Sequence, residues 1–365
     1  MVPERNIRSV TVQRVNFSPL MTTRKDLCRR VGFLTVSLLT IAISFSFAYS
    51  QTGDVIHQDL MVGQRLYREG RYAEASLALK AAVKRNKNDV DAWYYLGLCY
   101  LRQSDFKSAT KAFQTGLRLK PDSAAVHTGL ALTFLLRNKL KDALRESERA
   151  VALDSTNTDA HFVLGMVKLH IGKKEQALAE AELAIRLNDK FAAGYLLKTQ
   201  ALVSFGRDVI VADGHPATEY SKNFQEAAVA LEKYLQLTPD SSEKESWAQQ
   251  LEALRFHVAL RSEAGRKKYD VYNGREVTTK ARLLSKPEPT YTSKARAHGV
   301  TGIIVLRCIF AADATVKHIV VLSGLPDGLT WQAIEAARRI QFQPAILNGK
   351  PVSIPMQLEY NFNLY

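Results

Sequence analysis

The sequence predicts a multidomain protein in which an all-α solenoid of stacked helices is followed by a small α+β domain with an antiparallel sheet. Within residues 56–262, small and large apolar residues recur at helical spacing, and the pattern repeats every 34 positions. Within residues 278–365, short runs of alternating β-branched and polar residues are separated by turns, which is typical of strands. Residues 263–277 are polar and lack a periodic apolar face, so we predict a linker there and two modules that fold independently.

The helical repeat is clearest between residues 93 and 121. Its characteristic positions are occupied by Trp93, Leu96, Gly97, Tyr100, Ala109, Phe113, Gly116 and Pro121. Steps of 34 residues bring His127, His161 and Tyr195 to the position of Trp93. The pattern resembles a tetratricopeptide (TPR) unit, which implies stacked pairs of antiparallel helices. Small residues let the two helices of a pair approach, and large residues fill the space to the next pair.

Two features mark the C-terminal end of the predicted solenoid. The small residue that the repeat places at position 211 is reached only at Ala227, which predicts a loop inserted at residues 206–221. Residues 242–260 have an amphipathic helical pattern and are predicted to cap the solenoid. A TPR solenoid offers a concave groove to an unidentified protein or peptide ligand; the alternative is that it serves as a spacer.

The C-terminal module is predicted to contain a hairpin, a helix and a last strand. Residues 300–310 and 316–322 have the composition of strands, and a turn at residues 311–314 joins them. Residues 326–339 form an amphipathic helical pattern, and residues 352–365 alternate as a strand does. This order gives a small antiparallel sheet with a helix on one side, and we expect the last strand to have an uncovered edge.

Several short motifs in this module carry a family resemblance. They are Pro289 to Arg296, Gly299 to Gly302, Asp313 to Val316, Ser323 with Gly324, Ala333 to Arg339, Phe342 to Ala345, and Asn348 to Val352. In this order and spacing they resemble the TonB C-terminal domain. The resemblance implies a periplasmic protein of a Gram-negative-type bacterium that adds an extended segment of an outer-membrane TonB-dependent transporter to a sheet edge. In that family, inner-membrane motor proteins harvest proton-motive force, which the domain delivers as mechanical work, and the resemblance implies no cofactor.

The resemblance also implies where the partner segment binds. It would meet the last strand and the segment Pro289 to Tyr291, at Thr290, Tyr291, Val352, Ser353, Ile354, Met356, Gln357 and Leu358. We expect main-chain pairing to matter more than any one side chain. The alternative for Tyr291 is a core residue that pins the domain's N-terminal arm. The last strand could instead pair with another copy of itself.

Residues 1–50 have the features of an export signal. Basic residues precede an uncharged run at residues 31–49, and small residues at Ala48 and Ser50 suit cleavage by signal peptidase. Cleavage would leave a soluble periplasmic protein, whereas retention would leave an inner-membrane anchor. The run contains serines but lacks the histidine that energised TonB proteins use to engage their motor, and the solenoid replaces their proline-rich stem. The competing prediction is therefore a soluble periplasmic TPR scaffold without energy coupling.

The remaining composition argues against other functions. The net charge of +14 comes from basic residues dispersed among acidic ones, so we predict no nucleic-acid binding. The three cysteines form no CxxC pair, and the eight histidines form no HExxH motif. Nucleophile elbows and phosphate-binding glycine loops are absent from the sequence as well. We therefore predict no enzymatic activity and assign no catalytic, cofactor-binding or metal-binding residues.

Overall fold

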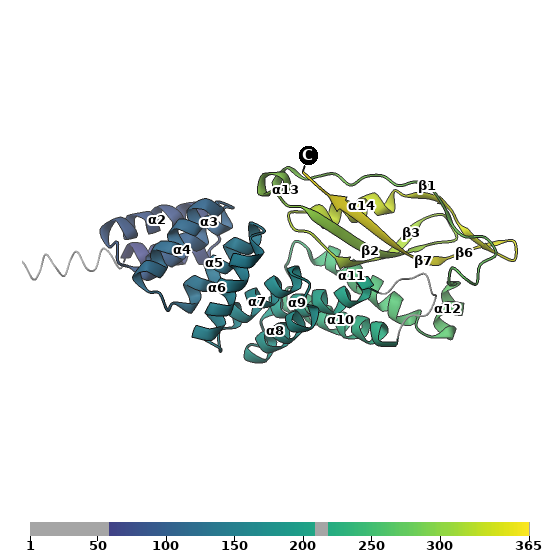
Figure 1. Cartoon of the computed structure of the whole chain (residues 1–365), viewed down its shortest axis with the longest axis horizontal. Coiled ribbons are helices and arrows are strands. Elements are labelled where there is room, and N and C mark those ends of the chain that lie inside the picture. The colour runs from purple at the N-terminus through teal and green to yellow at the C-terminus, as the bar shows by residue number, and fades with distance from the viewer. Residues whose placement is uncertain (1–57, 209–217, 365) are drawn as a thin grey trace, which may run out of the picture. The chain divides into compact units, whose positions relative to one another are not determined.

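The computed structural model describes residues 58–208 and 218–364, and residues 59–365 form one compact unit (Figure 1). The predicted signal or anchor at residues 1–50 and most of the predicted insertion at residues 206–221 lie outside the described ranges. Across the two ranges, no helix combines the length and the apolar character that a membrane span requires. The prediction of a helical solenoid followed by a small α+β domain is confirmed.

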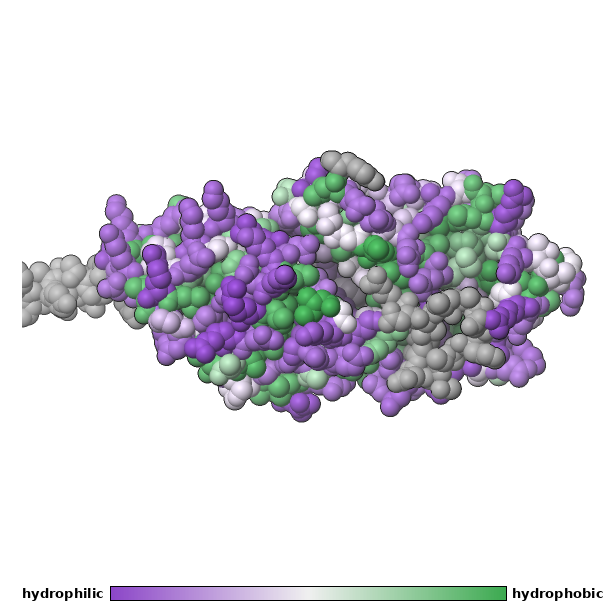
Figure 2. All heavy atoms as spheres, viewed as in Figure 1, coloured by the Kyte–Doolittle hydropathy of each residue, from purple (hydrophilic) through white to green (hydrophobic). Residues whose placement is uncertain are grey.

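The solenoid consists of consecutive helical hairpins. Their helices are residues 58–68 with α2 (Tyr72–Arg85), α3 (Val90–Arg102) with α4 (Phe106–Leu119), α5 (Ala124–Leu136) with α6 (Leu140–Leu153), α7 (Thr158–His170) with α8 (Lys174–Leu187), and α9 (Ala192–Ser204) with α10 (Thr218–Leu237). A short 3₁₀ helix, η1 (Phe205–Asp208), follows α9, and the predicted capping helix is α11 (Lys244–Ala259). In the drawn view, hydrophilic side chains cover much of helices α2–α8, as suits solvent-facing helices (Figure 2).

One hydrogen bond recurs with the 34-residue period. In the second to fifth hairpins, the first large residue of the repeat donates to the main-chain carbonyl six positions earlier. The bonds are Trp93 Nε1 to Lys87, 2.9 Å, His127 Nε2 to Pro121, 3.0 Å, His161 Nε2 to Ser155, 3.0 Å, and Tyr195 Oη to Asp189, 3.0 Å. Tryptophan, histidine and tyrosine side chains thus make the same bond, which stabilises the turn that precedes the first helix of each of these hairpins. The four repeats therefore share a donor at this position, whereas the shape of the side chain varies among them.

The predicted close approach of helices at Gly97 has a defined partner. A Cβ at Gly97 would lie 2.6 Å from Cε1 of Phe113, and a Cβ at Gly129 would lie 2.6 Å from the same atom. The Phe113 ring is fully buried and fills the space that these two glycines leave. Packing of α3 and α5 on α4 therefore depends on the missing side chains.

We predict that Gly97→Ala destabilises the chain by about 1–3 kcal/mol, because the new methyl group overpacks the Phe113 ring. Gly116→Ala is the matched control, since its Cβ would meet Val126 Cγ1 at 3.4 Å, an ordinary contact. That control should be neutral or stabilising, because alanine favours a helix more than glycine does. Urea unfolding measures both, and equal midpoints for the two variants would contradict the packing argument.

The C-terminal module contains small antiparallel sheets and three helices within the described residues. Its elements are α12 (Glu263–Tyr269), β1 (Arg282–Ser285), α13 (Ser293–His298), β2 (Gly302–Phe310), β3 (Val316–Ser323), α14 (Leu329–Arg338), β4 (Gln341–Gln343), β5 (Ala345–Leu347), β6 (Lys350–Val352) and β7 (Ile354–Phe362). The main sheet has the order β3-β2-β7, and β1 pairs with β4 and β5 with β6. The predicted last strand is divided between two strands. Val352 belongs to β6 and pairs with Ala345 of β5, and β7 begins only at Ile354.

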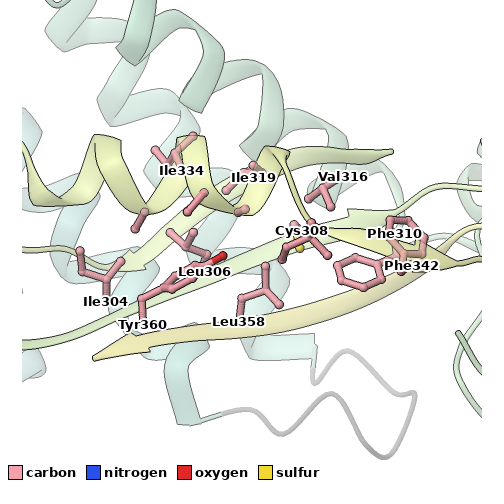
Figure 3. Packing of buried hydrophobic residues seen from close by; sticks show 14 of the residues in the cluster. Ile304, Leu306, Cys308, Phe310, Val316, Ile319, Ile334, Phe342, Leu358 and Tyr360 are labelled. Carbon is pink, nitrogen blue, oxygen red and sulfur yellow. The ribbon is translucent and has the colours of Figure 1, made fainter. Parts of the chain in front are cut away.

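One face of the main sheet forms the core of the C-terminal module. Side chains from β2 and β7 point toward α14, and Ile334 of that helix meets them (Figure 3). The residues labelled on these two strands are Ile304, Leu306, Cys308, Phe310, Leu358 and Tyr360. The rings of Phe310 and Phe342 stack with centroids 4.1 Å apart. This face corresponds to the predicted sheet with a helix on one side.

The opposite face of the sheet is buried against the solenoid. Val305, Val320 and Leu322 pack in one cluster with residues of α9, α10 and α11, including Leu202, Phe224, Leu231 and Leu254. A second contact joins the rings of Phe106 in α4 and His298 in α13, with centroids 4.8 Å apart. The sequence predicted two modules that fold independently on either side of a polar linker. The structure contradicts the separation of the modules, because the solenoid and the sheet share a hydrophobic core.

The predicted linker is folded onto the sheet as well. Its first half is helix α12, and Val271 then makes a parallel bridge to Ser353, the residue directly before β7. The Val271 side chain is buried against Leu260 and Ile309. Tyr272 and Val277 also pack against the core of the C-terminal module, so the predicted linker has three apolar contacts despite its polar composition.

We predict that a fragment of residues 270–365 is several kcal/mol less stable than the same region in the full chain. Isolation exposes three apolar side chains, each of which contributes about 1.5–3 kcal/mol when buried. Thermal melting and binding of an apolar dye check this, with recovery expected when a solenoid fragment of residues 56–262 is added. A fragment that melts cooperatively at the temperature of the full chain would contradict the shared core.

Candidate partner-binding edge

The main sheet has two edge strands, and the edge of β3 is closed by the solenoid. The side-chain amide of Gln250 in α11 donates to the Ile319 carbonyl at 3.0 Å and accepts from the Val321 amide at 3.1 Å. These are the two bonds that a neighbouring strand residue would make. His257, about two turns further along α11, donates from Nε2 to the His318 carbonyl at 2.9 Å. The helix therefore satisfies the β3 edge in place of a strand.

The edge of β7 can be assigned from the pairing register. β7 pairs residue for residue with β2, from Ile354 opposite Phe310 to Phe362 opposite Gly302. In an antiparallel pair, alternate residues bond inward and the others point their amide and carbonyl outward. Pro355 has no amide hydrogen, and the Glu359 carbonyl accepts a bond from Lys286 Nζ at 2.7 Å instead of one from β2. Both facts place the odd-numbered residues of β7 on the outward edge.

Part of this outward edge is already occupied. The Ser353 amide donates to the Asp270 carbonyl at 3.3 Å, and its carbonyl accepts from the Tyr272 amide at 2.9 Å. Pro355 offers no donor, and Lys286 holds the carbonyl of Glu359. Within residues 58–208 and 218–364, no main-chain group pairs with the outward edge between Gln357 and Asn361. This stretch is long enough to receive a short extended segment.

The arm before α13 lies beside this part of β7. Lys286 Nζ lies 4.6 Å from the centre of the Tyr360 ring, and burial raises the pKa of that tyrosine to about 12. The Tyr291 hydroxyl donates to the Val300 carbonyl, and its ring meets the Phe362 ring edge-on at 5.7 Å. Tyr291 therefore pins the arm to the core, which is the alternative considered for it from the sequence. Thr290 beside it is exposed.

The side chains of the other predicted partner residues lie mostly in the core. Val352, Ile354 and Leu358 are buried, and Met356 packs against the same cluster. Their main chains belong either to β6 or to the inward-bonding positions of β7. Gln357 remains as the predicted residue whose main chain faces the open edge.

Sequence reasoning missed Pro355, Glu359 and Asn361 at the edge and Lys286 beside it. The sequence contains a signal for Pro355, because a proline inside a strand must occupy a position whose amide is not needed for a bond to the neighbouring strand. Read in that way, Pro355 assigns every second residue of β7 to the outward edge. Lys286 lies 73 residues from its acceptor, and no local pattern points to this contact.

Metal or nucleophilic chemistry in the described residues would fall to the His, Asp and Glu side chains and to the two described cysteines. Over residues 58–208 and 218–364, no group of three or more His, Cys, Asp or Glu side chains could hold a metal ion. Burial raises the pKa of the Cys99 thiol to about 11 and raises that of Cys308 as well. Thiols in such surroundings stay protonated and are poor nucleophiles.

Comparison with protein families decides what these modules are. A model described as the Gram-negative bacterial TonB protein C-terminal matches residues 287–364, and a tetratricopeptide repeat model matches residues 60–124 and 100–158. The chain carries tetratricopeptide repeats and a TonB C-terminal domain. The matched TonB region begins in the arm next to Lys286 and includes all of β7. Helices α7–α10 lie beyond the matched repeats, but they keep the periodic hydrogen bond at His161 and Tyr195.

Three of the solved structures similar to this chain are TTC0263, PilW and PilF. TTC0263, a TPR protein of Thermus thermophilus, is 21% identical with a TM-score of 0.45, over 53% of this chain and 97% of that chain. PilW, a type IV pilus biogenesis factor, is 17% identical with a TM-score of 0.46, over 59% of this chain and 90% of its own. PilF of Pseudomonas aeruginosa is 18% identical with a TM-score of 0.41, over 60% of this chain and 97% of its own. No curated protein matches the chain.

We predict that the contact between α11 and β3 weakens in mild acid. Burial lowers the pKa of His257 to about 4, against an ordinary value of 6.5, although its bond to His318 opposes the shift. The unfolded state then binds the proton more readily than the folded state, so stability falls as the pH is lowered from about 6.5 to about 4. The expected loss is on the order of 2 kcal/mol over this interval.

The matched variant is His257→Gln, which keeps a donor for the His318 carbonyl and does not titrate. Denaturant unfolding of both proteins between pH 4 and pH 8 isolates the histidine's share of the pH dependence. Identical pH slopes for the two proteins would contradict the assignment of His257 as a half-buried neutral donor.

Proposed function

We propose that this chain is a periplasmic adaptor that binds an extended segment of an outer-membrane TonB-dependent transporter as an added strand on β7. The observation that carries the proposal is the difference between the two sheet edges. The β3 edge is closed by Gln250 and His257, whereas β7 has outward main-chain groups from Gln357 to Asn361. The TonB C-terminal match over residues 287–364 supports a partner of this kind. Both matched families are adaptor or scaffold domains, which agrees with a non-enzymatic role.

The solenoid supplies a second proposed binding surface. TPR repeats are protein-interaction modules, and we propose that the concave face of this solenoid binds a protein or peptide whose identity is open. Because the solenoid shares a core with the sheet, a ligand of the groove and a partner strand on β7 would be held by one folded body.

The strand-addition proposal predicts that Glu359→Pro weakens partner binding about tenfold or more. Proline removes the outward amide of this residue, and with it one main-chain bond to the added strand. Glu359→Ala is the matched control, since it keeps the amide and removes only an exposed side chain. The measurement is the affinity of the full chain for synthetic N-terminal segments of the outer-membrane transporters of its organism, with melting temperature as a folding control.

A variant with the opposite expected effect strengthens this test. Lys286→Ala frees the Glu359 carbonyl, which an added strand needs as an acceptor, so binding should tighten by a few-fold. If Glu359→Pro and Glu359→Ala stay folded and bind equally tightly, and Lys286→Ala changes nothing, strand addition on β7 is wrong for this chain.

The proposal has two forms, which differ at the N-terminus. If residues 31–49 are retained as an anchor, inner-membrane motor proteins could act on the chain, and it would transduce proton-motive force. If cleavage follows Ser50, the chain is a soluble scaffold without energy coupling. Intact-mass measurement on protein from the native membrane fraction distinguishes them, because a mature chain that begins at Gln51 excludes the anchored form.

A further inference from the structure

The centre strand of the sheet carries a charged side chain on the face that meets the solenoid. Arg307 of β2 lies two residues from Val305 of the shared core and is only 4% exposed. Its Nη2 donates to the Gly206 carbonyl at 3.0 Å and to Gln357 Oε1 at 3.3 Å. One guanidinium group therefore contacts the solenoid and β7 at the same time.

The two contacts of Arg307 join the end of the solenoid to the candidate binding edge. Gly206 belongs to η1, which directly follows α9 in the fifth helical hairpin and packs against β3. Gln357 is the outward-facing residue at which the open stretch of the β7 edge, Gln357 to Asn361, begins. Its main chain faces outward, while its side chain reaches across the sheet face to Arg307. The first residue of the candidate binding edge thus contacts Arg307, which in turn contacts the solenoid.

An edge strand needs such support more than a central strand does. β7 has main-chain bonds to β2 on one side, and an added strand can pair with it only if its outward groups stay in register. A planar guanidinium with several fixed donors can hold two acceptors in a defined geometry, which a flexible ammonium group does less well. In a buried setting, bonds to a charged donor are stronger than neutral ones.

We infer that Arg307 is a positioning residue through which the fifth helical hairpin holds β7 in the geometry that a partner strand requires. The inference rests on the proposed strand addition, and it goes further by making the solenoid part of the support of that site. It also implies that tension on a bound strand passes from β7 through Arg307 to the solenoid, in addition to passing along the chain.

The test breaks the link at its partly exposed end, in the full chain. Gln357→Met removes the acceptor and keeps the side-chain length and the outward amide. Gln357→Glu restores an acceptor oxygen for Arg307 and serves as the conservative rescue. Gln250→Met is the matched control, because it removes a comparable amide from the opposite edge of the same sheet.

Two readouts separate positioning from general stability. The first is amide hydrogen exchange of Met356 and Leu358, whose inward bonds to β2 report the opening of β7 without any ligand. The second is affinity for whichever transporter segment binds the wild-type chain most tightly. We expect Gln357→Met to speed exchange at these two amides about tenfold and to weaken binding about tenfold, and Gln357→Glu to restore both.

The outcomes are distinct from those of the strand-addition test. Wild-type exchange rates and affinity in Gln357→Met would overturn the inference while leaving strand addition intact. Equal acceleration at Met356 and Leu358 in Gln250→Met would also overturn it, because the effect would then be a general loss of stability. If no segment binds the wild-type chain, the proposed function fails, and the exchange measurement still decides whether Arg307 holds β7.

Discussion

The structure depends on how the two edges of a three-stranded sheet satisfy their main-chain groups. Each edge strand presents a row of amides and carbonyls that must bond to protein or water, and an uncovered row is a template for another strand. In this chain, helix α11 closes the β3 row with the side chains of Gln250 and His257. The β7 row is blocked at Ser353 and Pro355 and is open further along. Among the described residues, the sheet therefore leaves main-chain groups open to an added strand on its β7 side.

The packing of α11 on the β3 edge also joins the solenoid and the C-terminal module into one folded unit. Gln250 and His257 can reach the β3 edge because the apolar faces of α9–α11 pack on Val305, Val320 and Leu322. The last helices of the solenoid are thus capped by a sheet, in place of the polar cap that such repeats require. The helical repeats and β7 are consequently connected by packed side chains, including the buried Arg307.

The sequence predicted the repeats well because each unit uses the same local pattern. The 34-residue period, the helix at residues 242–260, and the hairpin of β2 and β3 all follow from spacing and turn residues. The capping role predicted for that helix did not, because the sheet covers it. The shared core did not follow, although β2 gives a signal for it. Residues 302–310 are almost continuously apolar, which is typical of a strand buried on both faces, and alternation would suit a strand buried on one face. Contacts such as Gln250 with Ile319 span 69 residues, and no local pattern encodes them.

Residue-resolved amide exchange of the full chain, with and without a bound transporter segment, tests the central claim most directly. Strand addition on β7 predicts new protection at the amides of Gln357, Glu359 and Asn361, which face outward, and little change at Met356 and Leu358, which already bond to β2. Protection confined to the helices of the solenoid, with Gln357, Glu359 and Asn361 unchanged, would contradict the account and would assign the partner to the TPR groove.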